Sequence, residues 1–309
     1  MRTLHGLEQI PVDWPPSAVS IGKFDGVHAG HRAVIAELKS LAEHDGLAAV
    51  VITFDRHPLA LLSPAHCPKP LVGVDQKLDL LAETGVDATL LLEFNEALAA
   101  LPPEEFVESI LVAGLHARHV LVGRDFRFGA RGAGDVALLQ ELGARHGFEV
   151  RLVDDVKRDN LHRVSSTWIR ELLVEGNVHE AARLLGHLPT VRGIVVHGAA
   201  RGRDLGFPTA NLSPDSVGFI PGDGVYAGWL TDAGTRYPAA ISVGNNPTFT
   251  GVAQKQVEAY VLDREIDLYD HQVEVSFVER IRGMVAFTGI EPLIEKIRDD
   301  VDRARAILA

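Results

Sequence analysis

The sequence predicts two domains of different class, an α/β domain followed by a smaller β-rich domain that ends in a helix. The 309 residues exceed the roughly 150 typical of a single domain. Short apolar runs alternate with helical patterns up to about residue 153, whereas short β-rich runs separated by Gly, Pro, Asn and Asp follow after residue 190. We place the boundary near His187, with domains at residues 1–186 and 187–309.

Hydrophobic periodicity defines each element of the first domain. Residues 31–46 have apolar positions at helical spacing and Gly46 at the C-terminal cap. Further helices are expected at 76–84, 103–111 and 135–146. The predicted strands are AVSI (18–21), LAAVVITF (47–54), DATLLLEF (87–94), RHVLVG (118–123) and FEVRLV (148–153). Strands that alternate with helices predict a parallel sheet with a nucleotide-binding pattern.

Two more helices are expected from TWIRELLVEG (167–176) and NVHEAARLLG (177–186). After them the sequence pattern changes from helical spacing to short β-rich runs. The predicted strands are VRGIVVHG (191–198), GVYAGWLT (224–231), YPAAISVG (237–244), QVEAYVLD (256–263) and HQVEVSFVERI (271–281). Short strands at this spacing suggest a small antiparallel barrel or sandwich. Residues 291–308 form an amphipathic pattern that predicts a C-terminal helix.

Composition excludes several classes of protein. Hydrophobic residues make up 46% of the chain and charged residues 23%, as in an ordinary folded protein. The net charge of -12 argues against nucleic acid as a partner. The single cysteine, Cys67, allows no intrachain disulfide and no zinc site built on two or more thiolates, which favours a reducing compartment.

No segment has the pattern of a signal peptide or of a membrane span. The N-terminus carries Glu8 and Asp13 where a signal peptide needs its apolar stretch, and no run approaches ~18 apolar residues. We therefore expect a cytoplasmic protein with no membrane partner. Its oligomeric state, including a homo-oligomer, is left open.

A glycine-rich turn, GKFDGVHAGHR (22–32), follows the first of the predicted strands. Its glycines permit close backbone approach, and the helix that follows offers amide N–H groups to a phosphate. His28 and His31, three residues apart, would project on nearly the same side of the first helical turn. Taken alone, the turn is better explained as a structural connection with two surface histidines. A metal ranks lowest because the HExxH spacing is absent.

Three ordered segments resemble bacterial bifunctional riboflavin kinase/FAD synthetases. GKFDGVHAGH is similar to the HxGH signature of nucleotidyltransferases, and GRDFRFG (123–129) to the family's flavin-side loop. RVSSTWIR (163–170) is similar to its counterpart of the KMSKS phosphate loop. The resemblance implies a Rossmann-like nucleotidyltransferase domain that adenylylates FMN with ATP to give FAD and pyrophosphate.

The resemblance also assigns residues of this adenylyltransferase site. It makes His28 and His31 catalytic, and it places the flavin at Asp125, Phe126 and Phe128, although relatives can carry Asn at position 125. Hydroxyls at a helix start and an arginine suit phosphate oxygens, while SST alone would favour an ordinary N-cap. The implied contacts to ATP and its phosphates are Gly22, Phe24, Asp25, Gly26, His28, His31, Arg163, Ser166, Thr167 and Arg170.

A second glycine-rich segment, GIVVHGAARGRDLGFPTANL (193–212), contains a basic loop with Arg201 and Arg203 that can fold over a polyphosphate. In the extended stretch after it, the hydroxyl of Thr209 and the amide of Asn211 point the same way, which suits two oxygen ligands of Mg2+. On composition alone, a barrel hairpin with incidental arginines is an equal alternative.

This segment resembles the nucleotide loop and PTAN motif of riboflavin kinase domains, with Ala200 in place of the family's first glycine. GVYAG, ISVGNNPTF, VEAYVLD and ERIRG follow in the family's order. LYDH at 268–271 departs from it, because relatives usually carry glycine after the tyrosine, which questions the geometry of that turn. The resemblance implies a β-barrel kinase domain with Thr209 and Asn211 as metal ligands. Its implied contacts to ATP are Gly198, Arg201, Gly202, Gly206, Pro208, Thr209 and Asn211.

The resemblance makes Glu258 the catalytic base of the kinase, which takes the proton of the ribityl 5'-hydroxyl. A carboxylate on the inward face of this β-rich run would be costly without such a role or a partner. Without the resemblance, Glu258 is interpreted as a solvent-facing strand residue.

The expected function is therefore phosphorylation of riboflavin to FMN, with release of ADP, followed by adenylylation of FMN to FAD. ATP is the co-substrate and Mg2+ the expected cofactor. The rivals are another HxGH adenylyltransferase, an aminoacyl-tRNA synthetase relative and a non-catalytic flavin-binding protein. A synthetase leaves PTAN and VEAYVLD unexplained, and a storage protein would have lost catalytic residues that this chain retains.

Overall fold

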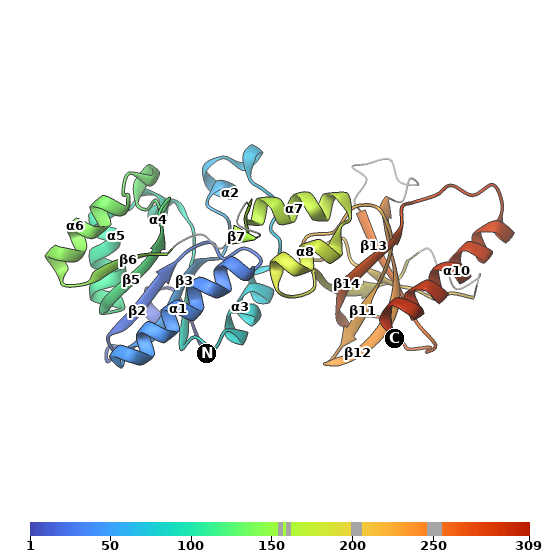
Figure 1. Cartoon of the computed structure of the whole chain (residues 1–309), viewed down its shortest axis with the longest axis horizontal. Helices are drawn as coiled ribbons and strands as arrows, with labels where there is room; N and C mark the ends of the chain where they lie inside the picture. Colours follow the sequence, from blue (N-terminus) through green and yellow to red (C-terminus); the bar gives the residue numbers. More distant parts are fainter. Residues whose placement is uncertain (154–156, 159–161, 199–205, 246–254) are drawn as a thin grey trace. The chain divides into compact units, whose positions relative to one another are not determined.

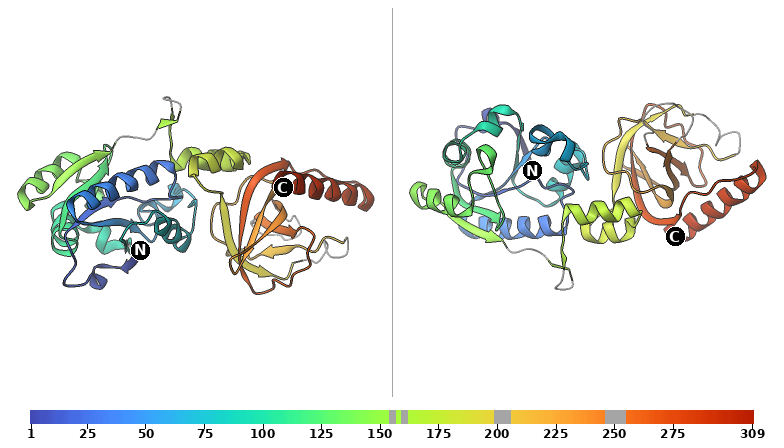
Figure 2. Two further views of the ribbon diagram at one scale, coloured as in Figure 1. Left: turned by 60° about the horizontal axis from the view of Figure 1, so that its bottom comes forward. Right: turned by 90° about the horizontal axis from the view of Figure 1, so that it is seen from above.

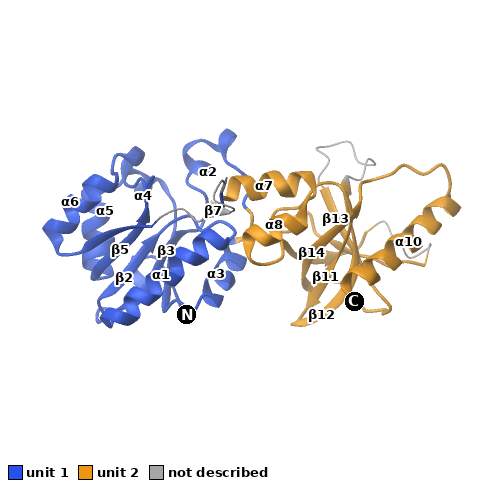
Figure 3. Cartoon of the chain, in the orientation of Figure 1, with its two compact units in different colours: residues 1–70, 74–164 blue, residues 71–73, 165–309 orange. Residues whose placement is uncertain are grey.

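The computed structural model describes residues 1–153, 157–158, 162–198, 206–245 and 255–309. The chain divides into two compact units, which Figure 3 distinguishes by colour. Unit 1 comprises residues 1–70 and 74–164, and unit 2 comprises residues 71–73 and 165–309. Arg201 and Gly202, which the sequence assigns to the kinase nucleotide loop, lie outside the described residues.

Unit 1 contains a six-stranded sheet with the order β1-β4-β3-β2-β5-β6, in which every neighbouring pair is parallel. The five predicted strands are confirmed, and β1 is an edge strand that was not predicted. The strands are β1 (Arg2–His5), β2 (Ser17–Ile21), β3 (Ala48–Phe54), β4 (Ala88–Leu92), β5 (Ala117–Gly123) and β6 (Glu149–Val153). β2 and β4 are buried along their whole length, as expected for strands covered on both faces.

Helices cover both faces of this sheet, as Figures 1 and 2 show. α1 (Ala29–Asp45) and α3 (Val74–Glu83) contribute to one hydrophobic core. α5 (Pro103–Phe106), the π-helical segment η3 (Val107–Gly114) and α6 (Val136–His146) contribute to the other. The shorter elements are η1 (Leu7–Gln9), α2 (Leu59–Leu62), η2 (Pro64–His66), α4 (Glu96–Ala100), η4 (Ala130–Gly132) and the two-residue strands β7 (Lys157–Arg158) and β8 (His162–Arg163).

Because all six strands run the same way, their carboxyl ends lie at one edge of the sheet. The turn 22–28 leaves β2 there, Phe54 ends β3 there, and the loop 123–129 leaves β5 there. This is the edge at which open α/β sheets bind ligands. Gly46, in the left-handed conformation at φ 65°, ends α1 at the opposite edge as predicted.

Unit 2 is built on a closed six-stranded antiparallel barrel, which confirms the barrel and excludes the sandwich. Its strands are β9 (Thr190–Val196), β10 (Ala210–Leu212), β11 (Gly224–Asp232), β12 (Thr235–Asn245), β13 (Lys255–Val261) and β14 (Gln272–Arg282). Tyr226 and Phe277 are fully buried and meet edge to face at 5.4 Å. Large side chains therefore occupy the core of the barrel.

The described part of unit 2 contains three further helices of eight or more residues. α10 (Ile290–Leu308) packs Val301 and Ala304 against Val225 and Ala227 of β11. α7 (Ser166–Glu175) and α8 (Val178–Leu185) confirm the two helices predicted before the barrel. The structure groups them with the barrel, while the proposed domain limits of 1–186 and 187–309 stay a prediction.

Candidate functional sites

The turn between β2 and α1 has an unusual backbone. Gly26 adopts a positive φ of 80°, but Phe24 and Val27 also have positive φ values of 46° and 38°. Such values are unfavourable for a bulky or β-branched residue and persist only where the surroundings enforce them. Phe24 and Val27 are buried, which holds the turn in this shape. The strained, buried turn therefore has the properties of a functional site.

His28 and His31 lie side by side, as their spacing predicts. Nδ1 of His28 accepts a hydrogen bond from the backbone N–H of His31 at 3.3 Å, so His28 is the N-cap of α1. The two rings stack with centroids 3.6 Å apart. A Cβ atom at Gly30 would lie 3.1 Å from the His28 ring, which explains why glycine stands between the histidines.

Positive groups gather around this turn in an otherwise acidic chain. Burial lowers the pKa of His31 well below its usual value, and the nearby charges of His28, Lys23, Arg163 and Lys77 lower it further. His31 is therefore neutral at pH 7. A site that opposes a further positive charge on its histidine is suited to an anion such as a polyphosphate.

The flavin-side loop and the start of the KMSKS-like segment meet in unit 1. Nη1 of Arg163 lies 3.2 Å from Oδ2 of Asp125, and both side chains are exposed. Phe126 stacks on Phe128 at 5.6 Å, and Phe128 is buried against Phe106. The half-buried Phe126 is therefore the more accessible of the two aromatic rings.

The remaining residues of the KMSKS-like segment begin α7. The N-cap is Ser165, whose hydroxyl accepts the backbone N–H of Trp168 at 3.3 Å. Ser166 and Thr167 thus occupy the first helical turn, and Arg170 follows in the second. These three residues belong to unit 2, and their part in adenylyl transfer stays a prediction.

Among the described residues, several of those predicted for the kinase lie around Asn211 of the barrel. Nδ2 of Asn211 donates to the backbone oxygen of Thr209 at 3.1 Å and lies 3.4 Å from its Oγ1, so the two side chains share one side as predicted. A Cβ atom at Gly198 would lie 2.5 Å from Cγ of Asn211, so only glycine permits this approach. Gly206 has a φ of 86°, and Pro208 directly precedes Thr209.

Glu258 lies opposite Asn211 across the β10–β13 pair and opposite Ser242 across the β12–β13 pair. Directly opposed residues present their side chains on the same face. Val257 and Ala259 are buried, while Glu258 between them is only half-buried and takes the other face. Glu258 is therefore not on the inward face, and it shares its face with Asn211.

The unusual turn at LYDH keeps a glycine-like backbone. Asp270 has a φ of 62°, a left-handed conformation that Asp tolerates better than most residues. Its backbone N–H donates to Val195 at 2.9 Å, and Nδ1 of His271 lies 3.1 Å from the Asp232 carboxylate. The departure from the family pattern therefore leaves the turn geometry intact.

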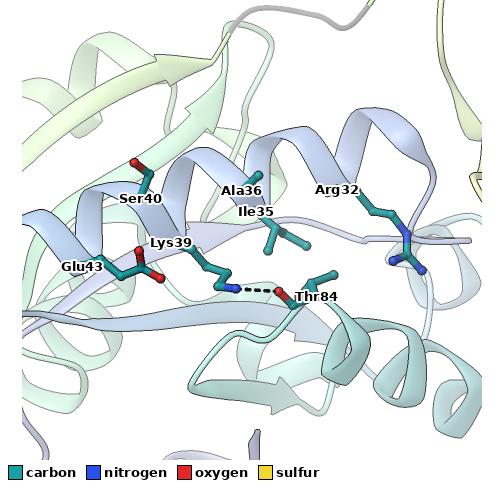
Figure 4. A pocket seen from close by; sticks show the side chains of 7 residues that line it. All are labelled: Arg32, Ile35, Ala36, Lys39, Ser40, Glu43 and Thr84. Atoms are coloured by element: carbon teal, nitrogen blue, oxygen red, sulfur yellow. Dashed lines mark hydrogen bonds between the residues drawn. The ribbon is translucent and has the colours of Figure 1, made fainter.

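Two surface hollows of about 290 Å3 each lie away from the predicted residues. One, in Figure 4, is lined by Arg32, Ile35, Ala36, Lys39, Ser40, Glu43 and Thr84. The other lies where α7 meets α8 and β14, and includes Gly176 and Arg280. Within the described part of the chain, no group of three or more His, Cys, Asp or Glu residues could hold a metal ion. Nor does any helix of that part have the length and apolarity to cross a membrane.

Sequence reasoning missed Lys23 and Lys77 near the histidine turn. Lys77 is only 8% exposed, and its Nζ donates to the backbone oxygen of Phe54, the last residue of β3, at 2.6 Å. The sequence does indicate that Lys77 is buried, because it lies four residues before the buried Leu81, on the apolar stripe of α3. A lysine in such a stripe indicates a buried cation with a specific partner.

Comparisons with known proteins agree with this arrangement. Residues 10–168 match the FAD synthetase family, and residues 185–308 match the riboflavin kinase family. The chain is 36% identical to a bifunctional riboflavin kinase/FMN adenylyltransferase of Listeria monocytogenes, covering 100% of this chain and 99% of the relative. It is 37% identical to the enzyme of that name from Escherichia coli, covering 99% and 96%.

A solved structure also matches along the whole length. It is named as a macrolide-efflux protein from Streptococcus pneumoniae, with a TM-score of 0.87, 32% identity and 99% of each chain covered. The two family matches follow each other along the chain in the order of the two motif sets. The chain therefore belongs to the bifunctional riboflavin kinase/FMN adenylyltransferase family.

Proposed function

We propose that the chain phosphorylates riboflavin to FMN with one ATP and adenylylates FMN to FAD with a second. Family membership over the whole chain supports both steps. The single observation that carries the proposal is the presence of two complete motif sets, each matched by its own family. ATP and the flavins are then the partners, with ADP and pyrophosphate as further products.

In adenylyl transfer, an oxygen of the FMN phosphate attacks the α-phosphorus of ATP. A P–O bond forms there, the bond from the α-phosphorus to the bridging oxygen breaks, and pyrophosphate leaves with that electron pair. The nucleophile is already ionised, so the site needs no base. We assign His28, His31 and the first amide groups of α1 to the developing phosphate charge, with Arg163 as a further cation.

In the kinase step, the ribityl 5'-hydroxyl attacks the γ-phosphorus of ATP, Glu258 accepts its proton, and ADP leaves. Glu258 has the required neighbours, because Asn211 lies opposite it and Thr209 lies beside Asn211. A carboxylate half-buried beside polar groups can accept a proton without an isolated buried charge.

The same face fits Mg2+. The side chains of Thr209 and Asn211 supply a hydroxyl and an amide oxygen on one side of the strand, which are the oxygen ligands that Mg2+ prefers. Exchanging the amide oxygen and nitrogen of Asn211 would turn its oxygen toward the Thr209 hydroxyl, with loss of the hydrogen bond from Nδ2 to the Thr209 backbone oxygen, for which a bound cation would compensate. Mg2+ bound there neutralises charge on the phosphates of ATP.

The test is product analysis of the purified chain incubated with riboflavin, ATP and Mg2+. We expect FMN first and FAD later, separated by HPLC, and neither product when EDTA is added. FMN with ATP should give FAD and pyrophosphate directly. A chain that binds flavin but forms neither product would be a flavin-binding protein, and one that adenylylates only another substrate would be a different adenylyltransferase.

A further inference from the structure

Lys77 is a buried cation at the ligand-binding edge of the unit 1 sheet. It belongs to α3, and its ammonium donates to the backbone oxygen of Phe54 at 2.6 Å, where β3 ends. It interacts electrostatically with Asp25 of the histidine turn and with Asp55, which follows β3. Lys77 therefore links three segments that meet at the same edge.

Hydrogen bonds hold the segments around Lys77 in place. Oδ1 of Asp55 accepts the backbone N–H of Phe94 at 2.8 Å, and Oδ2 lies 3.0 Å from Nε of Arg56. The backbone oxygen of Lys23 accepts a hydrogen bond from Thr53 of β3 at 3.1 Å. The ends of β3 and β4 and the turn after β2 thus form one bonded rim around the ammonium.

A lysine with a purely structural role would need fewer partners than this rim offers to Lys77. Lys39 shows what such a role looks like: its Nζ donates at 3.0 Å to the backbone oxygen of Thr84, the residue that follows α3 (Figure 4). Lys77, in contrast, is nearly fully buried, and its charge interacts with Asp25 of the proposed ATP site. Burying an ammonium is expensive, so a position with this cost points to function.

We propose that Lys77 is a positioning residue of the adenylyltransferase, which binds the carboxyl end of β3, where Thr53 also holds the histidine turn, and adds a positive charge near Asp25 and His31. This inference rests on the proposed function of the turn. The charge has two effects: it favours phosphate in the site, and it disfavours a proton on the His31 imidazole. The groups that face His31 are His28 and Lys23 on its own segment, Arg163, and Lys77.

The predicted effect on His31 has a definite sign. Burial is the largest cause of the lowered pKa of His31, and Lys77 is the weakest of the nearby charges that lower it further, so removing Lys77 raises that pKa by part of the shift. Lys77→Met should therefore make His31 titrate at higher pH and move the acid limb of FMN adenylylation to higher pH. Burial lowers the pKa of Lys77 itself to about 8, whereas arginine stays charged. Lys77→Arg should therefore leave the His31 titration close to that of the native chain.

The test follows the histidine ring signals of the full chain by NMR from acid to neutral pH, with His31→Gln used to identify the His31 signal. The variants are Lys77→Met, Lys77→Arg and, as the matched control, Lys39→Met. FMN adenylylation and riboflavin phosphorylation are measured on the same preparations. We expect Lys77→Met to raise the His31 titration and to lower kcat for adenylylation by about tenfold or more. Lys39→Met should change neither, and phosphorylation should stay within about twofold throughout.

Three outcomes overturn the proposal. An unchanged His31 titration in folded Lys77→Met shows that the lysine acts only on stability. A rise in KM for ATP with unchanged kcat shows direct phosphate contact instead of positioning. An equal shift in Lys39→Met shows that loss of any nearby ammonium suffices. If the native chain forms no FAD, the proposed function fails, while the NMR comparison still decides whether Lys77 sets the state of His31.

Discussion

At the scale of single residues, His28 combines a structural task with a proposed catalytic one. Its Nδ1 accepts the His31 backbone N–H, which caps α1, while its ring lies against that of His31. A simple truncation therefore removes two things at once. Asparagine is a good N-cap residue without an imidazole, so it separates the two tasks.

We predict that His28→Asn and His28→Ala both slow FMN adenylylation by about 10²- to 10³-fold, because each removes a donor to transition-state charge. Only His28→Ala should also lower the free energy of unfolding, by about 1 kcal/mol, since it alone loses the cap. Rates of FAD and FMN formation and urea denaturation check this. Equal loss of both activities in a folded variant would assign the turn to something other than adenylyl transfer.

For Glu258 we predict the opposite pattern, in which the kinase rate falls and the adenylylation rate is kept. Glu258→Gln keeps the size of the side chain but removes its ability to accept a proton, so FMN formation should fall by about 10²- to 10⁴-fold. FMN supplied directly should still become FAD at the native rate. Glu279→Gln, a change at an exposed glutamate of β14, a barrel strand that does not pair with β13, is the control and should leave both rates unchanged. An unaffected kinase rate in Glu258→Gln refutes its role as base.

At the scale of elements, α10 is fastened to β14 by one buried ion pair. Nε of Arg282 lies 2.9 Å from both carboxylate oxygens of Asp300, and Nη2 lies 2.6 Å from Oδ2. Asp300 is only 3% exposed. Replacing one partner of such a pair costs more stability than replacing both, because the remaining charge stays buried without its counter-ion.

We predict that Asp300→Ala lowers the free energy of unfolding by about 3–5 kcal/mol. Asp263→Asn removes the charge of an exposed ion pair with Arg305 of α10, keeps a residue that tolerates the left-handed backbone at this position (φ 58°), and should change stability little. Guanidinium denaturation of the two variants makes the comparison. Similar denaturation midpoints for both would show that the Asp300 pair does not fasten the helix.

Elements were predictable where their burial is visible in sequence. β3 and β4 are nearly continuous apolar runs, β2, β5 and β6 each contain a shorter group of apolar residues, and α1 ends at a glycine, so these elements were identified. β1 was missed because Leu4 is its only buried residue, and β10 because it has three residues. Motifs could name the candidate site residues, which stay a prediction, but not the pairing of Asn211 with Glu258, which depends on strand register between distant segments. Lys77 was missed because the free-energy cost of burying its ammonium is offset by partners from other elements.

At the scale of the whole molecule, α7 and α8 are bonded into the barrel unit. The backbone N–H of Gly222 donates to Leu173 at 2.7 Å, and Nη1 of Arg280 donates to the oxygen of Glu175 at 3.0 Å. A cation at the last carbonyls of a helix is favourable both as a hydrogen-bond donor and against the helix dipole. Ile169, Leu172 and Leu185 are buried along these helices.

We predict that a fragment starting at Ser165 phosphorylates riboflavin and unfolds at a higher temperature than one starting at Leu188. The shorter fragment exposes the surface that α7 and α8 cover and leaves Arg280 without the Glu175 oxygen. Neither fragment should form FAD. Thermal denaturation followed by circular dichroism provides the measurement, and equal midpoints would show that the two helices add nothing to the barrel.

The place of α7 also bears on how such an enzyme can be inherited. The helix carries Ser166, Thr167 and Arg170, which the family pattern ties to adenylyl transfer, yet it packs as part of the unit that contains the kinase residues. A gene broken before this helix would deprive one product of its predicted phosphate-binding segment, and a gene broken after it would deprive the other of part of its core. Fission of the gene therefore favours neither descendant, and selection should keep both reactions on one polypeptide.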